Sequence, residues 1–549
     1  MDKIDGKMFR NMILSGAENL RQHAEYVDSL NVFPVPDGDT GTNMNLSMTS
    51  GANEVEGRED AHIGTVGRHF SKGLLMGARG NSGVILSQLF RGFSKAIEEQ
   101  DEIGAEEFSS AFEAGVKTAY KAVMKPVEGT ILTVAKDSAE RARQAAGNET
   151  SIISIMEAVI EEAEASLERT PDLLPVLKEV GVVDSGGQGL VYVYKGFLSA
   201  LKGEALETAA KPAGTDTFVN DAHEFDEFMS AEDIEYGFCT EFMVRLEGDK
   251  REFDEDAFRQ DMSAFGDSLL VISDDEIAKV HVHTETPGEA MTYGSTYGEL
   301  IKMKIENMRE QFREIQEKKD ASAGGQQEKQ SYDTAIITVS SGAGINELFR
   351  SIGATHIING GQTMNPSTED ILRTIEGEDV KQVIILPNNK NIIMAAEQAR
   401  DMLDIPAVVI PTRSIPEGLS SLLVYSPDEA LGQVKEAMEA SLEHVRTGQV
   451  TYAVRDTKID SIEIKKNQHM GIKDGKIIGA DDSREATLKQ LIESMLDEES
   501  EIVTVLIGEE GDAEEVERII SSIEPAYDEV EFEVHDGQQP VYSYLLSVE

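Results

Sequence analysis

The feature that most constrains the fold is a series of glycine-rich polar loops that interrupt helical segments in the first 200 or so residues. Apolar residues recur there at helical spacing, most clearly over residues 9–20, 84–90 and 152–167, and runs typical of strands are scarce. Four interruptions, at residues 31–43, 76–83, 125–130 and 183–189, place glycine beside a hydroxyl or charged residue just before an apolar helix. The pattern favours a helical bundle or barrel.

The first of these loops sets two carboxylates, Asp37 and Asp39, one glycine apart. Pro34 and Pro36 keep the loop out of helix, and a helix-like segment follows at once. Mg²⁺ prefers hard oxygen ligands and keeps several positions for water and phosphate, so one or two protein carboxylates are enough to hold it. The loop therefore predicts a site for a divalent ion bound to nucleotide phosphates. An acidic turn that only caps the helix is the alternative that the spacing leaves open.

Several such loops at one end of a bundle would offer backbone amides and hydroxyls to phosphate groups. We expect Gly41 and the amides of Thr42 and Asn43 to approach phosphate oxygens at a helix N-terminus. Asn81 or Ser82 could cap the next helix and still point toward a ligand. Each turn taken singly is explained as a structural cap, but four in one helical domain favour nucleotide binding. No loop ends in the Gly-Lys-Ser/Thr of a Walker-type site.

Charge and cysteine content exclude several classes of protein. The chain has 102 acidic and 50 basic residues, a formal charge of −52, which argues against a surface for nucleic acid or for an anionic membrane. Cys239 is the only cysteine, which excludes an internal disulfide framework and fits a reducing cytosol. Because the N-terminus lacks an apolar signal core and no run is long enough to span a bilayer, we expect a cytoplasmic protein without an integral membrane segment.

The loops of the first domain resemble those of a known family. Asp37-Gly-Asp39-Thr-Gly-Thr-Asn43-Met, the Gly-Ala-Arg79-Gly-Asn-Ser-Gly loop and Asp184-Ser-Gly-Gly are similar to the nucleotide-binding (L-type, or DAK2) domain of dihydroxyacetone kinases. The resemblance implies a closed barrel of antiparallel helices that binds ATP through Mg²⁺ held by Asp37 and Asp39. It also implies contacts to the phosphates, or a place near the nucleotide, for Thr40, Gly41, Thr42, Asn43, Asn81, Ser82, Gly83, Gly129, Thr130 and Asp184.

One position departs from that family. Its members usually carry a further aspartate five residues before the first aspartate of the motif, and this chain has Val32 there. The sequence therefore does not identify a third protein ligand for the metal.

Over its whole length the chain resembles the ATP-binding subunit of bacterial fatty acid kinase. The resemblance implies that a separate DegV-type carrier protein presents a fatty acid, whose carboxylate is phosphorylated to an acyl phosphate for phospholipid synthesis. Such a carboxylate is already ionised near neutral pH, so the transfer needs positioning and charge neutralisation and no general base. Arg79, in a glycine-rich loop, is our candidate for a guanidinium contact to phosphate, with a surface arginine as the alternative.

Two other functions stay open at this point. A small-polyol kinase of the dihydroxyacetone type would normally need a substrate histidine, and no such context is visible in the chain. A regulatory module that binds nucleotide without turnover is the second alternative.

Linker-like tracts at residues 202–226 and 310–331 separate three predicted domains, at 1–202, 224–316 and 332–549. In the middle domain, residues 236–245, 268–273 and 277–284 are typical of strands, with a helix between the first two and another expected from about residue 298 to 318. This is a small α/β domain, and a homodimer through it is compatible with the sequence.

The middle domain carries a candidate metal site. His281 and His283 lie two apart on one predicted strand and so face the same side, and Cys239 lies on another strand. A cysteine and two histidines suit tetrahedral Zn²⁺, with Glu241, Glu285 or a water completing the set. The alternative is a polar sheet face beside a buried cysteine.

The C-terminal part alternates strands and helices. Short apolar strands at 334–339, 355–358, 382–386 and 407–410 predict a parallel sheet covered on both faces, followed by a second α/β half. The run Gly360-Gly-Gln-Thr-Met-Asn-Pro-Ser367 resembles a signature of the fatty-acid-binding DegV-type fold, and it lies where ligands bind in open α/β sheets. We expect this domain to bind the carrier protein; plain caps and turns are the alternative.

Overall fold

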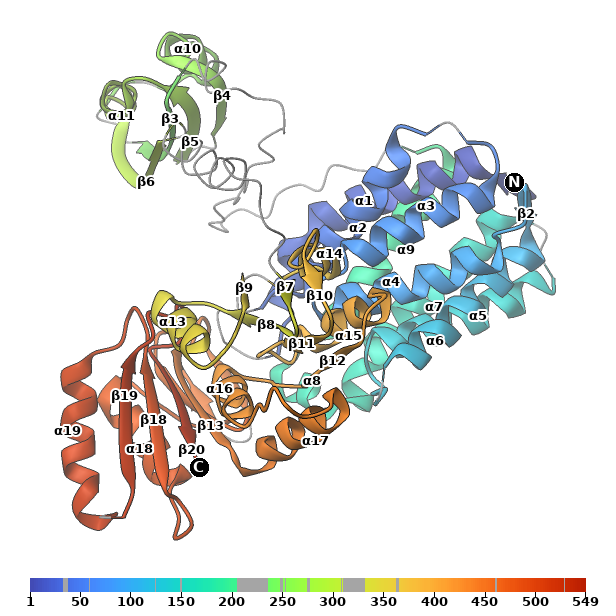
Figure 1. Cartoon of the computed structure of the whole chain (residues 1–549). Helices are drawn as coiled ribbons and strands as arrows, with labels where there is room; N and C mark the ends of the chain where they lie inside the picture. Colours follow the sequence, from blue (N-terminus) through green and yellow to red (C-terminus); the bar gives the residue numbers. More distant parts are fainter. Residues whose placement is uncertain are drawn as a thin grey trace. The chain divides into compact units, whose positions relative to one another are not determined.

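The computed structural model describes residues 1–32, 38–58, 60–123, 125–148, 151–204, 236–246, 250–251, 253–273, 277–307, 309, 331–361, 365–459, 462–527 and 529–549. These residues belong to two compact units, one made of residues 1–210 and 331–549 and the other of residues 211–330 (Figure 1). Asp37, most of both predicted linkers, and residues 224–235 and 310–316 of the predicted middle domain lie outside the described residues.

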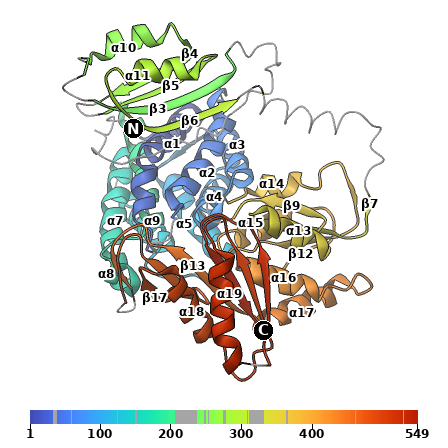
Figure 2. The same ribbon diagram turned by 90° about the vertical axis from the view of Figure 1, so that its left-hand side faces the viewer.

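The first part of the larger unit is a ring of helices (Figures 1 and 2). Each long helix packs against the next long helix in the chain, and the last one returns to the first. The helices are α1 Gly6–Ser29, α2 Thr40–Glu56, α3 Ile63–Met76, α4 Gly80–Ala96, α5 Ala105–Ala122, α6 Ile131–Ala146, α7 Ile152–Leu173, the short α8 Pro175–Val180, and α9 Ser185–Lys202. The predicted helical domain is confirmed.

Short connections make successive long helices run in opposite directions, so every second loop falls at the same end of the ring. The N-termini of α2, α4, α6 and α9 therefore share one end, and these are the helices that follow the four predicted glycine-rich loops. The opposite end carries a two-stranded antiparallel sheet of β1 (Lys3–Asp5) and β2 (Glu102–Gly104). The order of helices alone thus decides where a ligand site can form.

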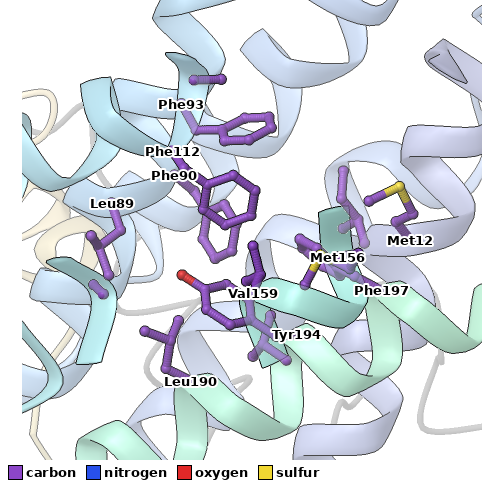
Figure 3. Packing of buried hydrophobic residues seen from close by; sticks show 14 of the residues in the cluster. Met12, Leu89, Phe90, Phe93, Phe112, Met156, Val159, Leu190, Tyr194 and Phe197 are labelled. Carbon is purple, nitrogen blue, oxygen red and sulfur yellow. The ribbon is translucent and has the colours of Figure 1, made fainter. Parts of the chain in front are cut away.

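Aromatic side chains fill the middle of the ring (Figure 3). Phe93 is stacked on Phe9 at 5.6 Å between ring centroids, and it meets Phe112 edge-on at 5.5 Å. Phe112 in turn meets Tyr194 of α9, whose pKa burial raises. Burying such a side chain contributes about 1.5–3 kcal/mol, so this cluster is a main source of the domain's stability.

The smaller unit is a four-stranded antiparallel sheet in the order β4-β5-β3-β6. Its elements are β3 Phe238–Leu246, α10 Glu255–Met262, β4 Gly266–Ser273, β5 Ile277–Thr284, α11 Pro287–Gly294 and β6 Gly298–Asn307. Residues such as Phe242, Phe258 and Val280 form the buried core between the sheet and the two helices. The strand predictions are confirmed, as is the helix between the first two.

The helix expected from about residue 298 is wrong over residues 298–307, which form strand β6 along β3. Ile301, Met303 and Ile305 alternate with charged residues at a period of two, which is the strand period. Backbone pairing with β3 decides the outcome, since Met303 and Ile305 are exposed and burial does not fix the segment. The rest of the expected helix, from residue 310, lies outside the described residues.

The C-terminal part of the larger unit has two α/β halves. The first holds a parallel sheet in the order β12-β11-β8-β9, with a short parallel pair β7 and β10. Its elements are β7 Ser331–Tyr332, β8 Ala335–Ser340, α13 Ala343–Ser351, β9 His356–Asn359, α14 Thr368–Arg373, β10 Asp379–Val380, β11 Val383–Leu386, α15 Ile393–Met402, β12 Ala407–Val409, α16 Ile415–Leu423 and α17 Leu431–Ser441.

Alternate residues of these strands enter two different cores, as the predicted two-sided burial requires. Ile336 and Ile384 belong to one cluster, and Ile337 and Ile385 to the other. The second cluster also contains Ala78 and Val84 of the helical domain, so one face of this sheet is covered partly by the helical ring.

The second half has a mixed sheet in the order β17-β16-β13-β20-β18-β19, a separate antiparallel pair of β14 and β15, and two helices. Its elements are β13 Arg446–Tyr452, β14 Thr457–Ile459, β15 Ile462–Ile464, β16 His469–Lys473, β17 Lys476–Asp481, α18 Arg484–Met495, β18 Ile502–Ile507, α19 Ala513–Ile523, β19 Glu531–Asp536 and β20 Tyr544–Val548. None of the described helices has both the length and the apolar character that crossing a membrane needs.

Close approach of α1 and α9 generates a stability prediction. A Cβ on Gly196 would lie 2.4 Å from the carbonyl oxygen of Ser15, so Gly196→Ala has to push the two helices apart. We expect it to lower the free energy of unfolding by about 1–3 kcal/mol in urea denaturation. Gly432→Ala in α17, where a Cβ meets nothing within 4 Å, is the matched control and should be neutral or stabilising. Equal effects of the two substitutions would contradict the close packing.

Candidate nucleotide and metal site

The loop before α4 lies directly on α2. Gly80 has a φ of +56°, and a Cβ there would lie 2.6 Å from the side-chain nitrogen of Asn43. A Cβ on Gly83 would lie 2.2 Å from Ser47 Oγ, which also accepts a hydrogen bond from the amide of Arg79 at 3.1 Å. Glycine at both positions is therefore needed for the two helix N-termini to approach, and this brings the first two predicted loops together.

The N-terminus of α2 is capped by a residue that the sequence did not single out. Asp28 Oδ1 accepts hydrogen bonds from the amides of Gly41 at 2.5 Å and Thr42 at 3.2 Å, and its Oδ2 accepts one from Thr42 Oγ1 at 2.7 Å. Thr40 Oγ1 donates to Asn31 Oδ1 at 2.7 Å. Burial raises the pKa of Asp28. These groups are thus engaged within the protein, and phosphate contacts by Thr40, Gly41 and Thr42 stay predictions.

Asp39 and Arg79 meet the C-terminal domain at this end of the ring. Asp39 stands at the N-cap position of α2 without making a side-chain cap bond, and its Oδ2 accepts a hydrogen bond from Nδ2 of Asn365. Arg79 donates through one guanidinium nitrogen to the carbonyl oxygen of Asn365 at 3.0 Å, and the same nitrogen lies 3.4 Å from Asp370 Oδ2. The Arg79 side chain is only 25% exposed, so it is held between the domains.

The third and fourth predicted loops, which precede α6 and α9, form a second pair. Asp184 caps α9, accepting a hydrogen bond from the amide of Gly187 at 2.7 Å, and it also accepts one from the amide of Ile131 at the start of α6. Thr130 is the N-cap of α6, after Gly129 with its φ of +84°. Burial raises the pKa of Asp184 to about 6. Asp184 is therefore a carboxyl that binds two helix N-termini and titrates close to neutrality.

The two pairs belong to neighbouring helices. Helix α9 packs against both α6 and α2, and a Cβ on its Gly189 would lie 2.6 Å from Met44 Sδ in α2. Among the other predicted site residues, Ser82 Oγ donates to the Thr40 carbonyl oxygen at 3.4 Å, and Asn81 donates to Asn391 Oδ1 at 3.4 Å. The predicted gathering of four loops is thus present in the fold, while the ligand contacts of single residues stay predictions.

The C-terminal domain also holds the other side of the acidic loop. Arg455 donates to the carbonyl oxygens of Ser29 at 2.6 Å, of Asn31, and of Val32 at 3.3 Å. Burial lowers the pKa of this guanidinium, but its three carbonyl partners satisfy its donors. No signal in the sequence marked Arg455, because it stands in an ordinary polar turn after β13.

In the sheet of the smaller unit, the backbone register places the residues of the predicted zinc site. Cys239 of β3 pairs with His283 of β5, and Glu241 pairs with His281, so all four positions are on one face of the sheet. The side chains of Cys239 and His281 lie outside the described part of the structure. The described residues contain no group of three or more histidine, cysteine or acidic side chains that could hold a metal ion. Zinc therefore stays a prediction.

Comparison with known proteins finds a family match for each of the three domains. Three family models match: the DAK2 domain over residues 34–199, the middle domain of FakA-like fatty acid kinase proteins over 235–315, and the C-terminal domain of the same proteins over 335–549. An uncharacterized protein of Staphylococcus aureus strain USA300 is 58% identical over 549 residues, covering 100% of both chains. An uncharacterized protein of Staphylococcus saprophyticus is 57% identical over 551 residues, again with 100% coverage of both.

Solved structures resemble single parts of the chain, with low overall scores. A DegV family protein of Corynebacterium glutamicum is 14% identical, covering 39% of this chain and 96% of that one, with a TM-score of 0.31. The dihydroxyacetone kinase of C. freundii, solved with AMP-PNP and Mg²⁺, is 19% identical, covering 35% and 33%, with a TM-score of 0.28. The fatty acid kinase B3 protein of Streptococcus pneumoniae, loaded with linoleic acid, is 12% identical, covering 40% and 99%, with a TM-score of 0.27.

The DAK2 match over the helical domain and the FakA-like matches over the other two domains define a multidomain kinase. The chain belongs to the FakA-like fatty acid kinase family, as the match of all three domains and the full-length relatives show.

The raised pKa of Asp184 predicts a pH dependence of stability. A folded-state pKa of about 6, above that of an exposed aspartate, means that the fold favours the protonated carboxyl. Its stabilising contribution is therefore complete below about pH 4 and is lost as the pH rises through about 6. In thermal unfolding across this window, Asp184→Asn should gain stability relative to the parent chain as the pH rises. Asp172→Asn, at a side chain that is 70% exposed, should show no such trend. The same trend in Asp172→Asn would contradict the raised pKa of Asp184 as its cause.

Proposed function

We propose that this kinase transfers the γ-phosphoryl group of ATP to the carboxylate of a fatty acid that a separate DegV-type carrier protein presents, giving an acyl phosphate. Membership of the FakA-like fatty acid kinase family supports the substrate class. The observation that carries the proposal is the position of Asp39 and Arg79 between the paired N-termini of α2 and α4 and the C-terminal domain.

The residues at this end fit an Mg²⁺-bound nucleotide. Asp39 supplies a carboxylate in the loop that also contains Asp37, assigned here from its spacing, and carboxylates are the oxygen ligands that Mg²⁺ uses with phosphates. When bound, Mg²⁺ neutralises charge on the transferring phosphoryl group. Arg79 can add a fixed positive charge from a loop held in place by the interface. The N-termini of four helices add partial positive charge without any net basic composition.

The acceptor is best delivered from outside. Two cavities of the C-terminal domain have volumes of about 200 and 220 Å³, below the roughly 300–1,000 Å³ of ordinary ligand pockets. Neither of these two cavities is large enough to enclose a long acyl chain, which agrees with a carrier that holds the chain and exposes only the carboxylate. Because that group is already ionised, no residue of this chain has to remove a proton from it.

We assign carrier binding to the C-terminal domain and take the domains as residues 1–202, 224–316 and 332–549. The family matches over 34–199, 235–315 and 335–549 support this division. In the larger unit, the C-terminal domain contacts the loop with Asp39, so a carrier seated on it would stand near the phosphate site. A homodimer through the middle domain stays a prediction.

Loss of a metal-binding carboxylate tests the proposed reaction. Asp39→Asn and Asp37→Asn should each lower the rate of acyl phosphate formation by about 100-fold or more, since charge neutralisation at the phosphoryl group is lost. The assay combines the full chain, Mg·ATP and a fatty-acid-loaded DegV-type carrier. Asp101→Asn, at the opposite end of the ring with a side chain 92% exposed, is the matched control. Unchanged rates in folded Asp39 and Asp37 variants, or phosphorylation of dihydroxyacetone instead of the lipid, would sink the proposal.

We also propose zinc bound by Cys239, His281 and His283, because the register of β3 and β5 puts these positions on one sheet face. Metal analysis of the purified chain should find about one zinc per chain, and Cys239→Ser should lose most of it because the thiolate is removed. Ser273→Ala on strand β4 serves as a control of similar size in the same sheet. A parent chain free of zinc would end the idea.

A further inference from the structure

Residue Asn365 of the C-terminal domain reaches the acidic loop from 326 residues away in sequence. It is 2% exposed. Its Nδ2 donates to Asp39 Oδ2, and its main-chain carbonyl oxygen accepts from the guanidinium of Arg79 at 3.0 Å. One residue of the C-terminal domain therefore contacts both the proposed metal ligand and the proposed phosphate ligand.

The other end of the same amide has no partner. Asn365 Oδ1 is buried, yet it accepts no hydrogen bond from any residue that the structure describes. Buried polar atoms are nearly always paired, so an orphan at the edge of a ligand site indicates a partner that is not protein. An amide oxygen is a hard, neutral ligand of the kind that Mg²⁺ and Ca²⁺ accept alongside carboxylates.

The position of Asn365 is fixed by its surroundings. Pro366 follows it, and then Ser367 and Asp370 form a reciprocal capping box at the start of α14. The amide of Thr368 donates to the carbonyl oxygen of Ala78 at 3.2 Å. Figures 1 and 2 show α14 and α15 beside the helical ring at the start of α4. The segment is thus anchored on the helical domain immediately before and beside Arg79.

The helical and C-terminal domains share a buried core at this contact. Gln398 of α15 donates to the carbonyl oxygen of Leu75 at 2.6 Å and to Thr368 Oγ1 at 3.1 Å, and it accepts from Gln88 at 3.1 Å. Ala78 and Val84, on either side of the Arg79 loop, are buried in the same cluster as strands β8 and β11. Buried polar pairs of this kind require a defined geometry, so Asn365 is held at a fixed place relative to Asp39.

We infer that Asn365 is a metal-site residue of the kinase, and that its amide oxygen joins Asp39 in holding the nucleotide-bound cation. The inference rests on the proposed function. The amide nitrogen keeps its hydrogen bond to Asp39 Oδ2, and the unpartnered Oδ1 is the atom that is offered to a cation on the same carboxylate. The C-terminal domain is therefore part of the nucleotide site as well as a platform for a carrier.

The test is the Mg²⁺ dependence of ATP binding by the full chain, measured by calorimetry with a metal-free reference in EDTA. Asn365→Ala should raise the Mg²⁺ concentration for half-maximal binding about tenfold, in the range seen when a group that supports a metal site is lost. Metal-free ATP binding should stay within about twofold of the parent, because a metal ligand acts only through the metal.

Asn365→Asp provides a second variant of the same shape. It sets a second carboxylate beside Asp39, so without metal it should unfold at a lower temperature than the parent, and Mg²⁺ should reverse this loss. Gln398→Ala is the control for the interface: it removes contacts between the domains without touching Asp39. It should lower stability and leave the Mg²⁺ requirement unchanged.

The outcomes separate this inference from the proposed function. If the parent binds ATP in an Mg²⁺-dependent way and Asn365→Ala keeps the parent's Mg²⁺ requirement, the inference alone is wrong. An equal shift in Gln398→Ala would also overturn it, since domain contact and not ligation would explain the effect. A parent chain whose ATP binding is independent of Mg²⁺ would overturn both.

Discussion

The structure depends on the alternating direction of helices around the ring. Each short connection reverses the chain, so α2, α4, α6 and α9 all begin at the same end. Helix N-termini carry unpaired amides and partial positive charge, and four of them at one end produce an environment suited to anions. In a chain with a formal charge of −52, such local potential cannot come from overall composition. It comes from backbone geometry and from single cations such as Arg79.

Two aspartate carboxylates cap helix N-termini at that end of the ring. Asp28 and Asp184 are each placed at helix N-termini, where they pair with amides, and burial raises the pKa of both. The backbone amides of α2, α6 and α9 that donate to these two carboxylates are therefore not available to a bound anion. Asp39 differs from them because it makes no side-chain cap bond and instead faces another domain. The same residue type thus serves as an internal cap in two places and as a contact to another domain in a third.

The C-terminal domain contacts the chain on both sides of the acidic residues in the first loop. Arg455 binds carbonyl oxygens before the loop, and Asn365 binds Asp39 after it. A shared hydrophobic core that includes Ala78 and Val84 connects the Arg79 loop to the parallel sheet. Binding of a carrier to the C-terminal domain and binding of nucleotide to the helical domain would therefore act on common residues. In the proposed reaction, this arrangement would connect delivery of the acyl group with the reacting phosphate.

The sequence by itself determined most of the helices and strands and their order. Helical periodicity marked the ring, glycines marked the four loops, and doubly apolar runs marked strands β8, β9, β11 and β12, because each of these signals is local in the chain. The strand β6 was misjudged since a ten-residue segment can follow either period until a partner strand pairs with it. Only the tertiary structure decided which groups meet at the site. Asp28 and Arg455 carry no local signature. Asn365 lies in the run 360–367 that the sequence did single out, but nothing local indicated its contact with Asp39, 326 positions away. Periodicity describes a single element, whereas such a contact depends on how separately folded domains pack.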